Sequence, residues 1–299
     1  MIEDCSMSGG RFASGLAAPF SAPSTLTAPL CRPRLAVNQV TTFHWSLLQD
    51  VIGFQEAGVE AIGLWRWKLI DFGEERAVDL ILESGLAVSS LSWAGGFTGM
   101  CGWSFEESLE DAREALHLAR QVGAECLILV SGPRAGHTRN HARRLLVEAL
   151  QRLADDAVRL GVKLGVEPMR RRFARNWTFL HTLDDTLQVV DDCHAPGVVG
   201  MVVDTSHLRA EPRLLERIPE VAERVVGVQL NDRRNKSASE TDGCLPGDGA
   251  IPVREIMHGF LKCGYRGFFE VEAWSDELWR SNYVETLETC RSKFAAMSV

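Results

Sequence analysis

The fold is decided by four short runs between residues 162 and 274: Val166-Glu167-Pro168, Val203-Asp204-Thr205-Ser206-His207, Val228-Gln229-Leu230-Asn231-Asp232 and Val271-Glu272-Ala273-Trp274. Each run is apolar until it ends in a polar or acidic residue, and helical patterns with Gly or Pro breaks flank it. Parallel strands that are buried on both faces have this nearly continuous apolar pattern. The runs therefore predict parallel strands that carry an enzyme's chemistry at their carboxyl ends.

The same unit of strand, loop and amphipathic helix extends over the chain from Leu35 onward. Strands are expected to begin near Leu35, Ala61, Leu86, Cys126, Val162, Val198, Val225 and Gly267. Helices are expected at about 45–57, 73–84, 105–122, 137–160, 182–192, 211–223, 252–263 and 281–296. Eight such alternations in about 265 residues predict one (β/α)₈ barrel. A doubly wound open sheet is the alternative, but the Gly-x-Gly-x-x-Gly or P-loop turn that usually follows its first strand is absent.

Residues 1–34 differ from the rest because they are rich in Ser, Ala, Pro and Gly and show no apolar periodicity. They also lack the continuous apolar segment of a secretory signal peptide. We expect a flexible N-terminal tail over 1–34, outside a barrel that occupies 35–299.

Composition narrows the class of partner. The net charge of -8 argues against a nucleic acid, because nucleic-acid binding depends on basic surface. No apolar run approaches the roughly 18 residues of a membrane span. The eight cysteines contain no Cys-x-x-Cys pair, which is typical of reduced thiols in a cytoplasmic protein. We expect a cytoplasmic protein with a small-molecule partner, and a homo-oligomer is compatible with these features.

Three acidic residues follow expected strands five, six and eight: Glu167, Asp204 and Glu272. Closure of a barrel would bring their carboxylates together, where their repulsion requires a counter-charge. A divalent metal, Mg²⁺ or Mn²⁺, supplies that charge and prefers oxygen ligands, and Gln229 on the seventh strand adds a neutral oxygen. The alternative is that such acids only cap the next helix, a role open to Asp204.

Other polar and aromatic residues at the strand ends are candidates for substrate binding. Trp65, Trp93 and Trp274 are predicted to form the walls of a pocket, and His207 to orient the substrate. Arg170 follows Glu167 closely enough to bind a carboxylate or phosphate. The alternatives are tryptophans that cap the barrel, a histidine that supports the ligands, and an arginine in a solvated loop or subunit contact.

Six motifs occur in a distinctive order: Gly63-Leu64-Trp65-Arg66-Trp67-Lys68-Leu69, Gly85-Leu86-Ala87-Val88-Ser89-Ser90-Leu91, Val166-Glu167-Pro168, Val203-Asp204-Thr205-Ser206-His207, Leu245-Pro246-Gly247-Asp248-Gly249-Ala250-Ile251-Pro252 and Gly264-Tyr265-Arg266-Gly267-Phe268-Phe269-Glu270-Val271-Glu272. With this order and spacing, residues 35–297 resemble the xylose isomerase-like barrels of the sugar phosphate isomerase/epimerase family. The resemblance implies a metal held by Glu167, Asp204, the seventh-strand residue and Glu272, with the two glutamates also moving protons.

The chain departs from that family at Gln229, where histidine is more frequent. Glutamine is the weaker ligand, so the departure bears on the affinity and identity of the metal and leaves the three carboxylates in place. Glu270 is a competing ligand, because it lies two residues before Glu272 on the same strand face. The endonuclease branch of the family needs several histidines at the site, and His207 alone lies convincingly at a strand end.

These residues predict a metal-dependent isomerase or epimerase acting on a sugar or polyol-derived carbonyl compound. A metal that polarises a carbonyl stabilises the enediolate formed when a neighbouring proton leaves. Glu167 and Glu272 would remove and return that proton. Loss of a β-hydroxyl from the same intermediate would instead make the enzyme a lyase, a dehydratase of a keto-sugar or inosose-like compound. A non-catalytic ligand-binding barrel with a degraded metal site is the remaining alternative.

Overall fold

A computed structural model describes residues 32–234, 239 and 241–299. Residues 1–31 of the expected flexible tail therefore lie outside the described residues. Arg34, which was assigned to that tail, is already the first residue of strand β1. The barrel thus begins one residue before the predicted boundary at Leu35.

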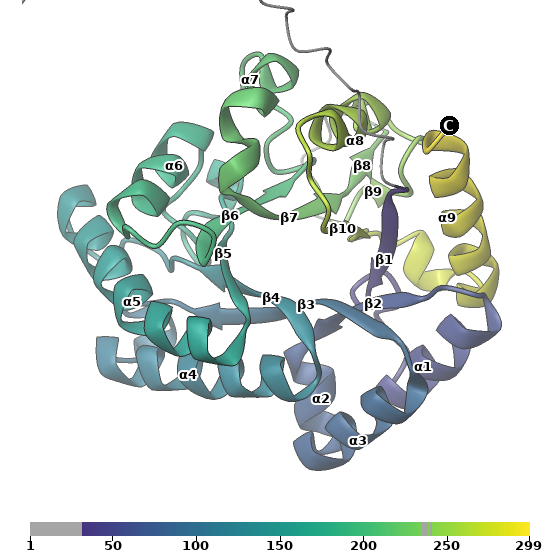
Figure 1. The fold of residues 1–299 in the computed structure, drawn as a ribbon, viewed down its shortest axis with the longest axis horizontal. Helices are drawn as coiled ribbons and strands as arrows, with labels where there is room; N and C mark the ends of the chain where they lie inside the picture. The colour runs from purple at the N-terminus through teal and green to yellow at the C-terminus, as the bar shows by residue number, and fades with distance from the viewer. Residues whose placement is uncertain (1–31, 235–238, 240) are drawn as a thin grey trace, which may run out of the picture. The chain divides into compact units, whose positions relative to one another are not determined.

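Eight parallel strands form a closed barrel, which confirms the predicted fold (Figure 1). They are β1 (Arg34–Asn38), β2 (Ala61–Trp65), β3 (Ala87–Gly95), β4 (Ala124–Val130), β5 (Lys163–Val166), β6 (Val199–Asp204), β7 (Val225–Leu230) and β10 (Phe268–Val271). Strand β10 pairs with β7 on one side and with β1 on the other, and this closes the ring. Every strand begins within two residues of its predicted start.

Helices surround the strand ring in Figure 1. Within the described residues they are α1 (Leu47–Glu56), α2 (Arg66–Phe72), α3 (Glu74–Ser84), α4 (Phe105–Gln121), α5 (Arg139–Leu160), α6 (Leu183–Asp192), α7 (Leu214–Val221), α8 (Val253–Lys262) and α9 (Tyr283–Met297). Single 3₁₀ turns occupy Met100–Gly102, Arg171–Phe173, Ala222–Arg224 and Leu278–Arg280. No helix in the described part of the chain is long and apolar enough to cross a membrane.

Helix signals in the sequence correspond to real termini. Ser104 caps α4 and forms a capping box with Glu107, and Gly161 ends α5 in the left-handed conformation that glycine adopts without strain. Helix α2 was not predicted, and it lies between the second strand and the helix expected at 73–84. Gly73, at φ 94°, separates it from α3. The second strand is therefore followed by two helices.

A short antiparallel hairpin, β8 (Asp232–Arg233) with β9 (Gly243–Cys244), follows β7. The carboxylate of Asp232 is fully buried and accepts hydrogen bonds from the backbone N–H groups of Gly247, Gly249 and Ile251, at 2.9–3.0 Å. Asp232 therefore holds the Gly-rich loop that leads into α8.

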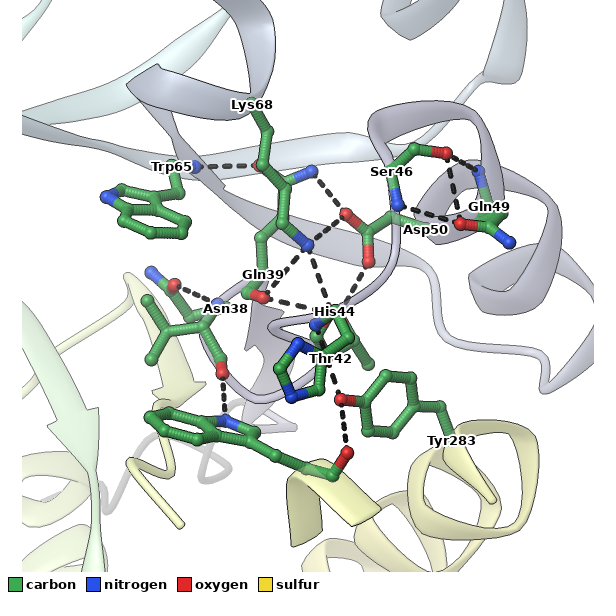
Figure 2. A network of polar contacts seen from close by, with 12 residues as sticks. Asn38, Gln39, Thr42, His44, Ser46, Gln49, Asp50, Trp65, Lys68 and Tyr283 are labelled. Carbon is green, nitrogen blue, oxygen red and sulfur yellow. Dashed lines mark hydrogen bonds and ion pairs between the residues drawn. The ribbon is translucent and has the colours of Figure 1, made fainter. Parts of the chain in front are cut away.

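A buried ion pair connects the loop after β1 to helices α1 and α2 (Figure 2). Lys68 Nζ lies 2.8 Å from Asp50 Oδ2 and also donates to the backbone oxygens of Thr42 and Gln39. Gln39 Nε2 and Thr42 Oγ1 donate to the same carboxylate at 2.7 and 2.6 Å. The side chain of Gln39 also accepts from the backbone N–H of Trp65, so the network fixes the end of β2.

Candidate active site

The predicted ligands lie at the carboxyl ends of neighbouring strands. Glu167 directly follows β5, Asp204 ends β6, Gln229 lies in β7 and Glu272 directly follows β10. All four side chains are at most 4% exposed. In a parallel barrel this placement brings loops and strand ends to one mouth, as the sequence analysis expected.

One group of side chains has the spacing that a metal ion needs. Potential ligand atoms of Glu167, Asp204 and His207 all lie within 4.8 Å of one another. His207 Nε2 is 3.6 Å from Glu167 Oε1. Its backbone N–H donates to Asp204 Oδ1 at 2.6 Å, so Asp204 also caps the turn that carries His207. His207, predicted to orient substrate, thus also lies where it could contribute a nitrogen ligand.

Gln229 and Glu272 form the other part of the site. The amide Nε2 of Gln229 donates to Glu272 Oε2, and Trp274 Nε1 donates to Glu272 Oε1 at 2.9 Å. Gln229 Nε2 also lies 3.3 Å from Glu270 Oε1. The oxygens of Glu270 accept further hydrogen bonds from Asn38, Ser89 and Ser90. Glu270, the competing ligand, is therefore engaged inside the barrel.

Burial and mutual repulsion dominate the electrostatics of the carboxyl groups. Burial raises the pKa of Glu167 well above its usual range, and the charges of Glu272 and Asp204 raise it further. Burial, with the charges of Glu270 and Asp204, raises the pKa of Glu272 to about 8. Hydrogen bonds from Trp274 and Gln229 act in the opposite direction. The site favours a bound positive charge.

His207 lies among positive charges as well. Burial lowers the pKa of His207 to about 4, and the guanidinium groups of Arg170, Arg233 and Arg172 act in the same direction. Asp204 opposes them without cancelling the effect. The imidazole is therefore neutral near pH 7, which is the form that binds metals or hydrogen-bonds to a substrate.

A cavity of about 120 Å³ opens onto these groups. Its lining consists of Trp93, Glu167, Met169, Phe173, Trp177, His207, Asn231, Arg233, Glu272 and Trp274. The rings of Trp93 and Trp274 are nearly parallel, at 16° with centroids 6.0 Å apart, and Trp177 lies 5.2 Å from Trp93. The cavity is therefore lined by aromatic rings together with carboxyl groups and an imidazole.

Two of the predicted substrate-binding residues lie outside this lining. Trp65 packs against Phe43 with a centroid distance of 5.2 Å, and Phe43 stacks on Trp279. Arg170 is half-buried, and its guanidinium carbon lies 5.7 Å from the centroid of the Phe173 ring. Arg170 thus contacts Phe173 of the lining, and its charge helps to lower the pKa of His207.

Five of the lining residues were not predicted from the sequence. Met169, Phe173 and Trp177 come from the loop between β5 and α6, and Asn231 and Arg233 from the chain that leaves β7. Asn231 and Arg233 follow the seventh strand closely, and residues after a barrel strand line the mouth of the barrel, so their place in the sequence could have identified them. Arg233 is 2% exposed and donates from Nε to Ser206 Oγ at 2.6 Å.

The residues present fit a divalent cation. Glu167 Oε2 and Gln229 Oε1 are buried oxygens that accept no hydrogen bond from any described residue. Buried acceptors are normally satisfied, so two such oxygens beside a cluster of carboxylates are consistent with a hard cation as their partner. Glu167, Asp204 and His207 have the spacing to hold it, whereas the expected ligand Glu272 is not part of that group.

Comparison with known proteins supports the same family. The chain is similar to 3-dehydroshikimate dehydratase of Pseudomonas putida, with 22% identity over 74% of this chain and 35% of that protein. It is also similar to fructoselysine 3-epimerase of Escherichia coli O157:H7, with 27% identity over 56% of this chain and 58% of that protein. The chain thus spans about a third of the first relative and just over half of the second.

A solved structure, that of the IOLI protein with a bound zinc atom, shares the fold. Its TM-score is 0.77 with 17% identity, over 89% of this chain and 98% of that one. A family model described as the xylose isomerase-like TIM barrel matches residues 54–293. With the closed barrel and the carboxylates at its strand ends, this match shows that the chain belongs to the xylose isomerase-like TIM barrel family.

Proposed function

We propose that this protein is a metal-dependent isomerase or epimerase that moves a proton beside a carbonyl group of a small, sugar- or polyol-derived substrate. The observation that carries the proposal is that Glu167 and Glu272, two buried carboxyl groups from different strands, line the same cavity. A pair of acids placed on either side of a substrate can remove a proton and return it.

Glu167, Asp204, Gln229 and Glu272 would hold Mn²⁺ or Mg²⁺. When bound, the ion would polarise the carbonyl oxygen and stabilise the negative charge that develops on it. Glu167 and Glu272 would exchange the proton of the adjacent carbon.

The remaining lining residues would position the substrate. Trp93, Trp177 and Trp274 offer apolar faces to a ring, and His207 can hydrogen-bond to its hydroxyl groups in the neutral form. Arg233 lines the cavity, and the charges of Arg170 and Arg172 extend to His207. The positive charge favours substrates that also carry a carboxylate or phosphate.

Dehydration is the second candidate, and one observation favours it. The match to the Pseudomonas putida dehydratase covers 74% of this chain, whereas the match to the epimerase covers 56%. For a carboxylate-bearing β-hydroxy ketone, one carboxyl group would remove the proton from carbon, and the hydroxyl group would leave as water with a proton from the other carboxyl group. Arg233, whose guanidinium group pairs with Asp242, would then share its N–H donors with the substrate carboxylate.

Proton exchange in D₂O tests the proposal directly. Protein loaded with Mn²⁺ is incubated with ketoses, fructoselysine and 3-dehydroshikimate, and NMR records carbon-bound deuterium and any dehydrated product. Glu167→Gln and Glu272→Gln should abolish exchange and product formation, whereas the exposed control Glu288→Gln should retain them. Turnover that survives in both site variants, or a wild type that neither exchanges nor converts any of these substrates, contradicts the assignment.

A further inference from the structure

Glu270 lies inside the barrel below the candidate metal site. Its side chain is 3% exposed, and it is directly opposite Gln229 in the register of β10 and β7. Its four hydrogen-bond partners come from strands around the ring: Asn38 at 2.8 Å, Ser89 at 2.5 Å, Ser90 at 2.7 Å and Gln229 at 3.3 Å. In each of these contacts Glu270 is the acceptor.

This arrangement constrains which end of the Gln229 amide can face the metal site. An amide has one end that donates, Nε2, and one end that accepts, Oε1. Carboxylate oxygens accept hydrogen bonds, and Nε2 donates to both Glu270 Oε1 and Glu272 Oε2. The two carboxylates therefore use both N–H groups of Nε2. Oε1 remains, buried and with no donor among the residues that the structure describes.

We propose that Glu270 is a positioning residue, which fixes the Gln229 amide so that its carbonyl oxygen is the end available to the metal. The inference rests on the proposed function, because it assigns Gln229 as a ligand. Glu270 itself does not touch the ion. A rotated amide would place Nε2, which cannot bind a cation, at the coordination position and Oε1 against two carboxylates.

The space around Glu270 supports a fixed position. Gly63 lies beneath its carboxyl group, where a Cβ atom would come within 2.6 Å of Glu270 Cδ and Oε2. The same Cβ would lie 2.8 Å from Asn38 Nδ2. The absence of a side chain at residue 63 is therefore what allows the carboxylate to lie there, between its donors and Gln229.

The test compares Mn²⁺ affinity, measured by titration with EPR detection of the free ion. Glu270→Gln gives residue 270 an N–H group and so permits the rotated Gln229 amide. We expect it to weaken Mn²⁺ binding about 10–100-fold, as loss of a group that orients a metal ligand does. Ser90→Ala is the matched control, since it removes one hydrogen bond from the same carboxylate but leaves the acceptor that orients Gln229.

A double variant with the two side chains exchanged distinguishes loss of the Gln229 amide orientation from a general disruption of the structure. In Gln229→Glu combined with Glu270→Gln, the number of carboxylates is unchanged and residue 229 has two equivalent oxygens, so no orientation is needed. We expect it to recover most of the affinity lost in Glu270→Gln. Wild-type affinity in Glu270→Gln, a loss in Ser90→Ala as large as that in Glu270→Gln, or no recovery in the swapped variant overturns the proposal.

A crystal structure of the Mn²⁺-loaded wild type provides a measurement that needs no variant. Gln229 Oε1 should be in the coordination shell with Nε2 toward Glu270, and the opposite placement overturns the proposal. If the wild type binds no Mn²⁺, both this inference and the proposed function fail. If the affinity pattern holds but no substrate exchanges a proton or is converted, the positioning role stands and the proposed function fails.

Discussion

Replacement of Lys68 by methionine should strongly destabilise the fold. Asp50 is fully buried, and Lys68 is 7% exposed, so the pair is removed from water. Lys68→Met leaves the Asp50 carboxylate with only the neutral donors Gln39 and Thr42 (Figure 2). Removal of one partner from a buried ion pair costs about 3–5 kcal/mol of unfolding free energy. The thermal midpoint should fall by on the order of 10 °C.

The unfolding free energy lost in Lys68→Met should increase with pH. Burial raises the pKa of Asp50 from 3.8 to about 6, although Lys68 lowers it. Without Lys68 the folded-state pKa of Asp50 rises further. Below the unfolded-state pKa, the Asp50 carboxyl group is protonated in both the folded and the unfolded state, so its burial costs little unfolding free energy. At higher pH the folded variant must bury an unpaired carboxylate or take up a proton that the unfolded state does not bind, and either lowers its stability. The deficit of Lys68→Met should therefore grow as the pH rises from about 4.

Unfolding by urea, followed by circular dichroism at pH 5 and pH 8, measures both effects. The double variant Asp50→Asn with Lys68→Met removes both charges and should be less destabilised than Lys68→Met alone at pH 8. Lys262→Met, at an exposed position, should change stability by less than about 0.5 kcal/mol. A Lys68→Met variant within about 1 kcal/mol of the wild type at pH 8 would refute the reasoning.

Three further outcomes test other parts of the structure. Mn²⁺ at a hundred times its Kd should stabilise the wild type by about 2.7 kcal/mol in thermal unfolding, and Asp204→Asn should reduce this gain. Trp177→Ala should raise KM more than it lowers kcat in steady-state assays, because it removes a wall of the cavity and no proton-transfer group. Gly249→Ala should destabilise the protein in calorimetry, since a Cβ there would lie 2.1 Å from Asp232 Oδ1 and 2.5 Å from Arg233 N.

The sequence predicted the strands and their functional ends because both depend on local pattern. Apolar runs bounded by glycine or polar residues specify where a buried strand begins and ends, so the strand placement of Glu167, Asp204 and Glu272 followed from the chain alone. Helix α2 was missed because Trp65-Arg66-Trp67-Lys68 reads equally well as the end of a strand. Periodicity does not distinguish these readings over so few residues.

The contribution of Trp177 to the aromatic wall could not be predicted, because its position depends on contacts between distant segments. Gly132 N, after β4, donates to the backbone oxygen of Trp177 at 2.9 Å. Ser131 Oγ lies 2.9 Å from Thr178 Oγ1 and accepts from the backbone N–H of Phe179. The loop between β5 and α6 is thus bound to the end of β4, and no local pattern in either segment encodes that contact.

The residue that is tolerated at position 229 should depend on the residue at position 270. A histidine at this position that binds a cation through one ring nitrogen has a single N–H left. It therefore cannot donate to both Glu270 and Glu272 as the Gln229 amide does. In the metal-free protein a neutral imidazole likewise has one N–H, so Gln229→His should lower the thermal midpoint at pH 8, although imidazole is a good ligand for transition metals.

The combination of Gln229→His with Glu270→Gln should recover part of that stability, because the second change removes one of the two carboxylates that need a donor. A double-mutant cycle of thermal midpoints in EDTA measures the coupling. Additive effects of the two substitutions would mean that Glu270 and residue 229 are independent. The presence of glutamine at residue 229 would then need a physical explanation other than the carboxylate of Glu270 beside it.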